Sequence, residues 1–100
     1  MYKISYSKTA ERYFKKIKDK KLLAAFKDAI DKLADDPYIG TQKVGDLQGI
    51  YGYDVKYAKT NYEIAYRIYE ENEQIVVVIM AGTRENFYDE LKRLIKSTPQ

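Results

Sequence analysis

Cysteine and histidine are both absent from the 100 residues of this chain. The first absence excludes disulfides and thiolate metal sites, and the second removes the commonest metal ligand and the commonest general base. A glycine-rich phosphate loop is missing as well. We therefore expect no metal ion and no other cofactor, and any proton transfer must use a carboxylate, a lysine or a tyrosine.

Long apolar segments are also lacking. The chain has no run of the ~18 apolar residues that a membrane span requires, and no apolar, cleavable leader at its beginning. These absences suit a cytoplasmic protein that does not engage a membrane. A hydrophobic content of 45% and a charged content of 33% are typical of soluble globular proteins. We therefore expect residues 1–100 to form a single domain with one modest core.

Charge is unevenly distributed along the chain. Residues 1–32 contain ten Lys or Arg against four Asp or Glu, whereas residues 33–100 contain eight against eleven. Such a basic segment could attract phosphates or an acidic protein partner. A solvated, lysine-rich helix face explains the same pattern equally well.

Three consecutive strands are predicted between residues 47 and 88. Alternation in residues 62–69 places one set of side chains toward the core, namely Tyr62, Ile64, Tyr66 and Ile68. The opposite face of the sheet is predicted to be polar and to carry Asp54, Lys56, Glu63 and Arg67. Residues 58–61 are predicted to form a hairpin connection in which Asn61 provides the turn chemistry. Residues 75–81 are apolar throughout, as expected of a strand covered on both faces.

Helices are predicted both before and after these strands in the sequence. Ser7 is a plausible N-cap for a first helix, and a second helix ends just before Pro37, which disfavours helical geometry in the residue preceding it. Thr83 is the expected cap of a last helix. With a short strand at residues 1–6 and a loop at residues 38–46, the order is β-α-α-β-β-β-α. We predict an α+β fold in which helices pack on a mostly antiparallel four-stranded sheet.

Four side chains could converge around a phosphate at the polar face of this sheet: Lys56, Arg67, Arg84 and Tyr88. If the last helix starts at Thr83, Arg84 and Tyr88 are neighbours in its first turn. That turn is also where free backbone N–H groups favour an anion. The four residues are therefore candidates for a site that acts on a phosphate.

Each candidate also has a plainer explanation. Tyr88 could edge the core, and Lys56 could be a solvated strand lysine. Arg67 could pair with a carboxylate across the sheet, either Asp54 or Glu63, in an ion pair that contributes little at a surface. Arg84 could be a helix-end residue without a special role.

Several segments, in this order and spacing, resemble the RelE/ParE toxins. They are the leading "YKISYS", the loop and strand "GDLQGIYGYDVKY", the strand "NYEIAYRI", the corner "IVVVIMAGTRENFY" and the closing "ELKRLIK". The resemblance covers essentially the whole chain. It implies a toxin of a type II toxin–antitoxin system. RelE-like members are ribosome-dependent endoribonucleases that cut mRNA without a metal, and ParE-like members poison DNA gyrase.

The resemblance also implies roles for individual residues. Lys56 matches a catalytic lysine, Arg84 matches the arginine at the end of the last strand, and Tyr88 matches a tyrosine that stacks on or activates the nucleotide. In the RelE-like reaction the ribose 2′-hydroxyl attacks the adjacent phosphate, which requires positioning, cations and proton transfer. With no histidine in the chain, the base must be Lys56 or Tyr88.

Two departures from the family pattern replace cations by carboxylates, at Asp54 and Glu63. Our hypothesis is that Arg67, on the same face of the strand as Glu63, takes over phosphate stabilisation. Glu63 is a minor candidate for the base. We further expect Lys43, Lys59 and Glu63 to contact RNA.

Three functional interpretations follow. The favoured one is a RelE-like endoribonuclease that cuts mRNA on the ribosome, and the others are a non-enzymatic gyrase-binding toxin and a toxin fold that only binds its antitoxin. In each case the expected partner is a cognate antitoxin, with which the chain forms a hetero-oligomer. We expect the antitoxin to pack an amphipathic helix or strand against the chain and to cover or displace the last helix.

Overall fold

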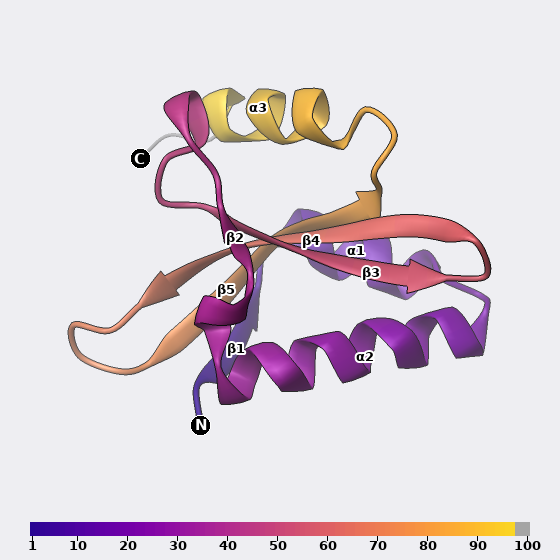
Figure 1. Ribbon diagram of the computed structural model, residues 1–100, viewed down its shortest axis with the longest axis horizontal. Helices are drawn as coiled ribbons and strands as arrows, with labels where there is room; N and C mark the ends of the chain where they lie inside the picture. Colours follow the sequence, from indigo (N-terminus) through magenta and orange to yellow (C-terminus); the bar gives the residue numbers. More distant parts are fainter. Residues whose placement is uncertain (98–100) are drawn as a thin grey trace.

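The computed structural model describes residues 1–97, which form three helices and a five-stranded sheet (Figure 1). In chain order the elements are β1 (Lys3–Tyr6), α1 (Lys8–Lys16), α2 (Lys20–Asp35), β2 (Thr41–Gln42), β3 (Tyr51–Tyr57), β4 (Thr60–Tyr69), β5 (Ile75–Thr83) and α3 (Phe87–Ser97). The predicted α+β class and element order are confirmed, with one strand added. Residues 98–100 of the predicted domain lie outside the described part. Among the described residues, no helix has the length and apolarity to cross a membrane.

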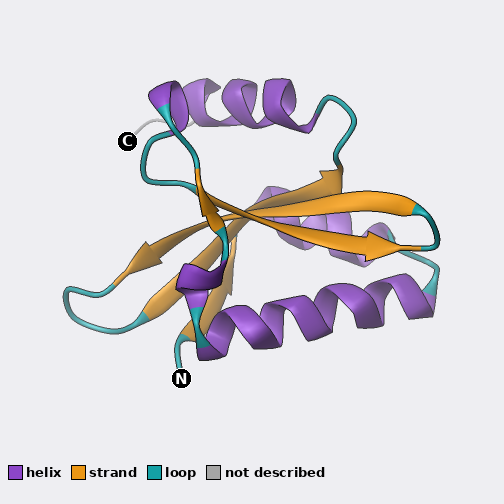
Figure 2. Cartoon of the chain, in the orientation of Figure 1, coloured by secondary structure: helices purple, strands orange, loops and turns teal. Residues whose placement is uncertain are grey.

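The sheet has the order β1-β5-β4-β3-β2 (Figure 2). β1 pairs in parallel with β5, and the other neighbours are antiparallel. The predicted count of four strands is wrong because β2 forms inside the segment expected to be a loop, with Thr41 opposite Gly52. A strand of two residues shows no alternation in the sequence, so its backbone pairing alone defines it.

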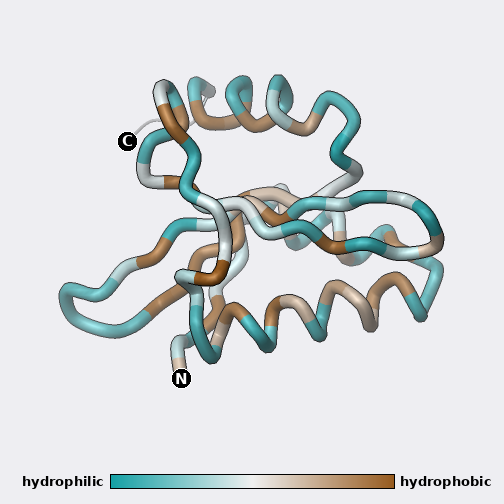
Figure 3. The backbone as a smooth tube through the Cα atoms, viewed as in Figure 1, coloured by the Kyte–Doolittle hydropathy of each residue, from teal (hydrophilic) through white to brown (hydrophobic). Residues whose placement is uncertain are grey.

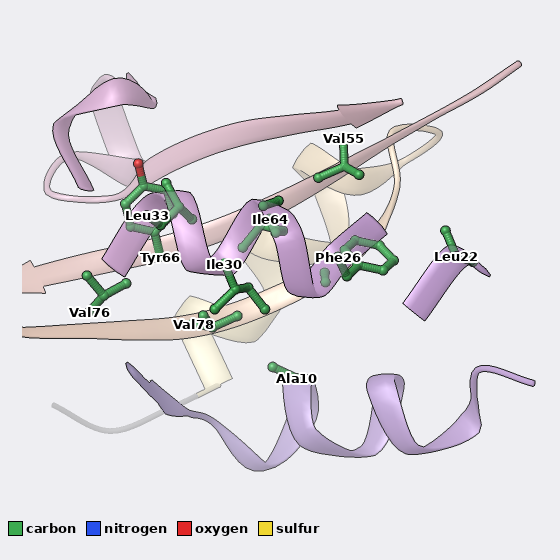
Figure 4. Close-up of a cluster of buried hydrophobic side chains, with 12 residues drawn as sticks. Ala10, Leu22, Phe26, Ile30, Leu33, Val55, Ile64, Tyr66, Val76 and Val78 are labelled. Atoms are coloured by element: carbon green, nitrogen blue, oxygen red, sulfur yellow. The ribbon is translucent and has the colours of Figure 1, made fainter. Parts of the chain in front are cut away.

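Helices cover both faces of the sheet. α1 and α2 lie on one face, and their contacts with the strands form a first core of Phe26, Ile30, Leu33, Ile64, Tyr66, Val76 and Val78, with further residues around them (Figures 1 and 4). α3 lies on the other face, over a second core of Leu47, Ile50, Ala65, Ile79, Met80, Phe87 and Leu91. The apolar sides of the helices turn toward the sheet (Figure 3). One face of the sheet was predicted to be polar. This is wrong where α3 covers that face, because the residues there are apolar. The polar residues Asp54, Lys56 and Glu63 lie at the end of the face, toward the hairpin.

Residues 75–81 of β5, the apolar part of the strand, contribute to both cores, as predicted. Its pairing with β4 contains a bulge, since Ala65 faces Met80 while Tyr66 faces Val78. Ile79 is the extra residue. The bulge lets Ile79 and Met80 both contribute to the core under α3, while Val78 belongs to the core on the other face.

Local signals set most of the helix ends. The Ser7 hydroxyl accepts a hydrogen bond from the Ala10 N–H at 3.0 Å, which confirms the predicted cap of α1. α2 ends at Asp35, two residues before Pro37, as predicted. The predicted start of α3 at Thr83 is wrong, because Thr83 is the last residue of β5 and pairs with Tyr62.

The hairpin between β3 and β4 is tighter than predicted. Its connection is only Ala58 and Lys59, with φ angles of 48° and 68°. Positive φ at both central residues is the type I′ pattern that matches strand twist. Asn61, predicted to make the turn, instead lies in β4 opposite Lys56.

Candidate site at the polar end of the sheet

At the end of the sheet that α3 leaves uncovered, the neighbouring strands β3, β4 and β5 bring two cations into one row. Lys56 on β3 faces Asn61 on β4, and the Asn61 carbonyl accepts a 2.9 Å hydrogen bond from the N–H of Arg84, just past β5. Adjacent strands are about 4.8 Å apart, so this row puts the backbones of Lys56 and Arg84 about 10 Å from each other. The row is open to solvent, because Lys56 and Arg84 are both exposed.

The next row of the sheet carries the two carboxylates that depart from the family pattern. Asp54 on β3 faces Glu63 on β4, and Glu63 faces Gly82 on β5. Like charges directly opposite each other are destabilising unless cations neutralise them. Here the neutralising cations are Arg84 and Lys43.

Glu63 is the buried member of this group. It is 5% exposed, and it is the one charged side chain that is buried among the described residues. Its Oε2 atom lies 2.6 Å from Lys43 Nζ, and its Oε1 atom lies 3.8 Å from Arg84 Nε. Within residues 1–97, Oε2 makes no hydrogen bond in addition to this ion pair. Taking a carboxylate out of water in this way is costly unless partners of opposite charge lie against it.

Gly52 provides the space in which this ion pair lies. A Cβ atom added at Gly52 would collide with Glu63 Oε2 and would lie 2.9 Å from Lys43 Cε. Lys43 follows β2 directly, and its N–H donates to the Ile50 carbonyl at 2.8 Å. The Lys43 side chain therefore passes over β3 at its glycine to reach β4.

Arg84 contacts both carboxylates. Its Nη1 atom lies 3.6 Å from Asp54 Oδ2, in a pair whose side chains are 55% and 67% exposed. Exposed ion pairs of this kind contribute little to stability and are readily exchanged. A phosphate could therefore take the place of Asp54 as the partner of Arg84.

Arg67 is not brought to this group. It lies four residues beyond Glu63 along β4, a distance of about 13 Å. It faces Val77, and its Nη1 atom lies 3.2 Å from where a Cβ of Gly49 would be. Neither Asp54 nor Glu63 forms an ion pair with it in the described part of the chain, so the simpler explanation of a cross-strand pair is not observed either.

In the described part of the chain, no ion pair or hydrogen bond joins Tyr88 or Lys59 to this group. Tyr88 is 44% exposed in the first turn of α3, and Lys92 Nζ lies 4.4 Å from its ring centroid. Its exposure argues against a role in the core. Because α3 starts at Phe87, Arg84 precedes the helix and the two residues are not neighbours in one helical turn. Lys59 is exposed at the tip of the hairpin.

The ion pair between Lys43 and Glu63 was missed by sequence reasoning, which expected both residues as RNA contacts and considered Arg67, not Lys43, as the partner of Glu63. One signal was available. Gly52 interrupts an otherwise regular strand, and a glycine inside a strand often marks a place where another group approaches closely. The sequence does not say which group that is, because Lys43 lies in a segment with no periodic pattern.

Comparison with known proteins identifies relatives over nearly the whole chain. The sequence profile of the ParE-like toxin of type II bacterial toxin–antitoxin systems matches residues 4–92. No curated protein matches the chain.

Three solved structures share the fold. The RelBE2 toxin–antitoxin complex of Mycobacterium tuberculosis matches with a TM-score of 0.65 and 26% identity, over 83% of this chain and 98% of the other. The intact RelBE complex of E. coli matches with a TM-score of 0.66 and 20% identity, over 82% of this chain and 95% of the other. A double-arginine mutant of the E. coli toxin RelE in the free state matches with a TM-score of 0.74 and 17% identity, over 98% of both chains.

Proposed function

Since the chain belongs to the ParE-like toxins of type II bacterial toxin–antitoxin systems, we propose that it is an endoribonuclease that cuts mRNA on the ribosome. The observation that carries this proposal is the row formed by Lys56 on β3, Asn61 on β4 and Arg84 just past β5. It holds two exposed cations whose backbones are about 10 Å apart, with β4 between them. A single phosphodiester and its neighbours can lie between two such cations.

The proposed reaction is an internal transesterification. The ribose 2′-hydroxyl attacks the adjacent phosphorus and loses its proton to a base, and the bond to the 5′-oxygen of the next nucleotide breaks as that oxygen takes up a proton. The products are a 2′,3′-cyclic phosphate and a free 5′-hydroxyl. Arg84 stabilises the negative charge that develops on the phosphate oxygens, and the Lys56 ammonium does so as well where Tyr88 is the base. Tyr88 is the candidate for stacking on the nucleotide, and Lys56 or Tyr88 for the base.

A second function is favoured by the two carboxylates. Asp54 and Glu63 offset the charges of Lys43 and Arg84, so that these four groups together carry no net charge. A non-enzymatic ParE-like toxin that binds gyrase has no need of a cationic site and would tolerate this. A chain that only binds its antitoxin would tolerate it as well.

Brief induction in bacteria followed by primer extension on a reporter mRNA separates these functions. We expect discrete cuts within translated codons for the wild type and none for Arg84→Ala, whereas Arg12→Ala, on the far side of the sheet in α1, should cut normally. Binding of the cognate antitoxin should survive in both variants. Growth arrest without cuts would favour the gyrase-binding toxin, and no arrest at all would favour a chain that only binds its antitoxin.

An antitoxin is the partner that the relatives support, because two of the similar structures are toxin–antitoxin complexes. An apolar groove of about 650 Å³ between β1, α1 and α2 suits the amphipathic segment that such a partner would supply. Ile4, Phe14, Ile17 and Phe26 line it, and Leu23 is 39% exposed at its edge. We propose this groove as one place where the antitoxin packs.

A further inference from the structure

Glu63 holds two cations that approach it from opposite directions. Lys43 comes from the β2 edge of the sheet and contacts one carboxylate oxygen, and Arg84 comes from the end of β5 and lies near the other. The carboxylate itself is buried. It is therefore poorly placed to touch a large substrate, but well placed to fix the positions of groups that do.

We propose that Glu63 is a positioning residue, which holds the Lys43 ammonium as a third phosphate-binding cation beside Arg84. This inference rests on the proposed endoribonuclease function and extends its site to Lys43. Substrate contacts are made by Lys43 and Arg84, and Glu63 acts through them.

The Lys43 side chain retains the means to bind a phosphate. It is 21% exposed, so part of it reaches solvent although its ammonium lies against Glu63. An ammonium group has three N–H donors, and a single carboxylate oxygen uses one of them. The remaining donors can reach a phosphate oxygen on the solvent side while the ion pair stays closed.

The surroundings indicate that the position of this ammonium, and not only its charge, is fixed. Gly52 leaves a space that the pair fills, and a methyl group there would meet both Glu63 Oε2 and Lys43 Cε. The backbone of Lys43 is tied to Ile50 by its N–H. A long, flexible lysine is thus held at both ends, which lowers the conformational entropy it must lose when a phosphate binds.

The two carboxylates then have opposite roles. Asp54 is exposed, and Arg84 is its one ion-pair partner within the described residues, so it competes with a phosphate for that guanidinium. Glu63 is buried beneath the cations and aligns them. Neutralising Asp54 should therefore strengthen RNA binding, whereas neutralising Glu63 should weaken catalysis.

The test is single-turnover cleavage of a defined mRNA on purified ribosomes. We expect Glu63→Gln and Lys43→Met each to lower the rate by about 100-fold, the loss typical of one misplaced electrostatic donor. The double variant should be no slower than either single variant, because both changes remove the same positioned group. Gly52→Ala, which keeps both charges but displaces them, should lower the rate similarly. Asp54→Asn should cut at least as fast as the wild type.

Controls distinguish positioning from stability. The exposed pair of Lys3 and Glu73, with 2.9 Å between Nζ and Oε2, is the matched control, and Lys3→Met/Glu73→Gln should cut normally. If either single variant fails to fold, the double variant Lys43→Met/Glu63→Gln is measured in its place. The double variant is expected to fold because it leaves no buried, unpaired charge.

Three results would overturn the inference. Unchanged rates per folded molecule in Glu63→Gln and Lys43→Met would make the pair purely structural. Losses that multiply in the double variant would show that the two residues act independently, as they would if Glu63 were the base. A wild type that does not cut would remove the proposed function and this inference with it, whereas Arg84-dependent cleavage without any effect at Glu63 would remove the inference alone.

Discussion

Single residues determine how the polar end of this sheet is organised. Glu63 brings a carboxylate into the protein interior, Lys43 and Arg84 neutralise it, and Gly52 leaves the room for the closer of the two pairs. Burying one charge without its partner is far more costly than burying neither. The stability of the chain should therefore respond to this pair as well as its activity.

Lys43→Met should lower the free energy of unfolding by about 1–3 kcal/mol, since it leaves Glu63 with only the longer Arg84 contact. The double variant Lys43→Met/Glu63→Gln should be more stable than Lys43→Met alone, because no buried charge remains. Urea unfolding followed by circular dichroism measures both. Equal destabilisation in the single and double variants would mean that the pair does not interact in solution.

The carboxylate of Glu70, just after the end of β4, should make the stability of the chain depend on pH. Hydrogen bonds from the Tyr38 hydroxyl and then the Tyr2 hydroxyl lower the pKa of Glu70 below its ordinary value. A lowered folded-state pKa means that the unfolded chain binds the proton more readily. The stabilisation is therefore complete above the unfolded-state pKa and is lost as pH falls through the folded-state value.

Glu70→Gln should make the acid decline in melting temperature shallower below the ordinary glutamate pKa of ~4.3. Glu71→Gln is the control, because the Glu71 side chain makes no hydrogen bond or ion pair within residues 1–97. Melting curves at closely spaced pH values measure the effect. Parallel declines in the two variants would contradict the assigned role of Glu70.

At the scale of elements, the hairpin between β3 and β4 is the one place in residues 1–97 where two consecutive non-glycine residues have positive φ. Ala58 and Lys59 both adopt left-handed backbone conformations without being glycines. Such a conformation costs a non-glycine residue roughly 1–2 kcal/mol. The turn is retained because strand pairing on both sides and a hydrogen bond from Tyr57 to Asp19 at 3.1 Å hold it.

Ala58→Gly should therefore raise the free energy of unfolding by about 0.5–1 kcal/mol. The same substitution at Ala24, an exposed position in α2, should lower it by about 1 kcal/mol, because glycine disfavours a helix interior. Chemical denaturation measures the free energy of unfolding of both variants, and we expect it to shift in opposite directions. A loss of stability in Ala58→Gly would contradict the strained turn.

Elements with local chemical signals were predictable from the sequence. The Ser7 cap, the end of α2 before Pro37 and the alternation in β4 all depend on neighbours within a few residues. The start of α3 was not predictable in this way. Thr83 resembles a helix cap, but its pairing with Tyr62 on β4 makes it a strand residue, and that contact spans about twenty positions of sequence.

The candidate site was predictable in part for the same reason. The structure places Lys56 and Arg84 in one row at the end of the sheet, on either side of Asn61. Their role in a site stays a prediction. The expected convergence of Arg67 with them is not observed, since Arg67 lies four positions beyond Glu63 along β4. The pair between Lys43 and Glu63 depends on β2, whose existence the sequence did not reveal.

At the scale of the whole molecule, the two faces of the sheet divide two proposed tasks. The face under α1 and α2 carries the apolar groove, and the end of the other face carries the cations. Binding of an antitoxin in the groove and cleavage of RNA should therefore be separable by mutation.

Leu23→Asp should weaken antitoxin binding by at least ten-fold while leaving the fold intact, because the side chain is partly exposed at the groove edge. Burying a carboxylate against an apolar partner is unfavourable. Val44→Asp, at a position that is 76% exposed and outside the groove, is the matched control. Calorimetric titration with the cognate antitoxin measures both, and equal affinities would place the antitoxin elsewhere.

The measurement that tests the central claim most directly uses the purified chain and ribosomes that carry a defined mRNA. We predict discrete cuts within the translated codons, a 2′,3′-cyclic phosphate on each upstream fragment, and no cut with Arg84→Ala. Intact mRNA after incubation with the wild type, or equal cleavage by Arg84→Ala, would contradict the assignment of the cations at the end of this sheet as an endoribonuclease site.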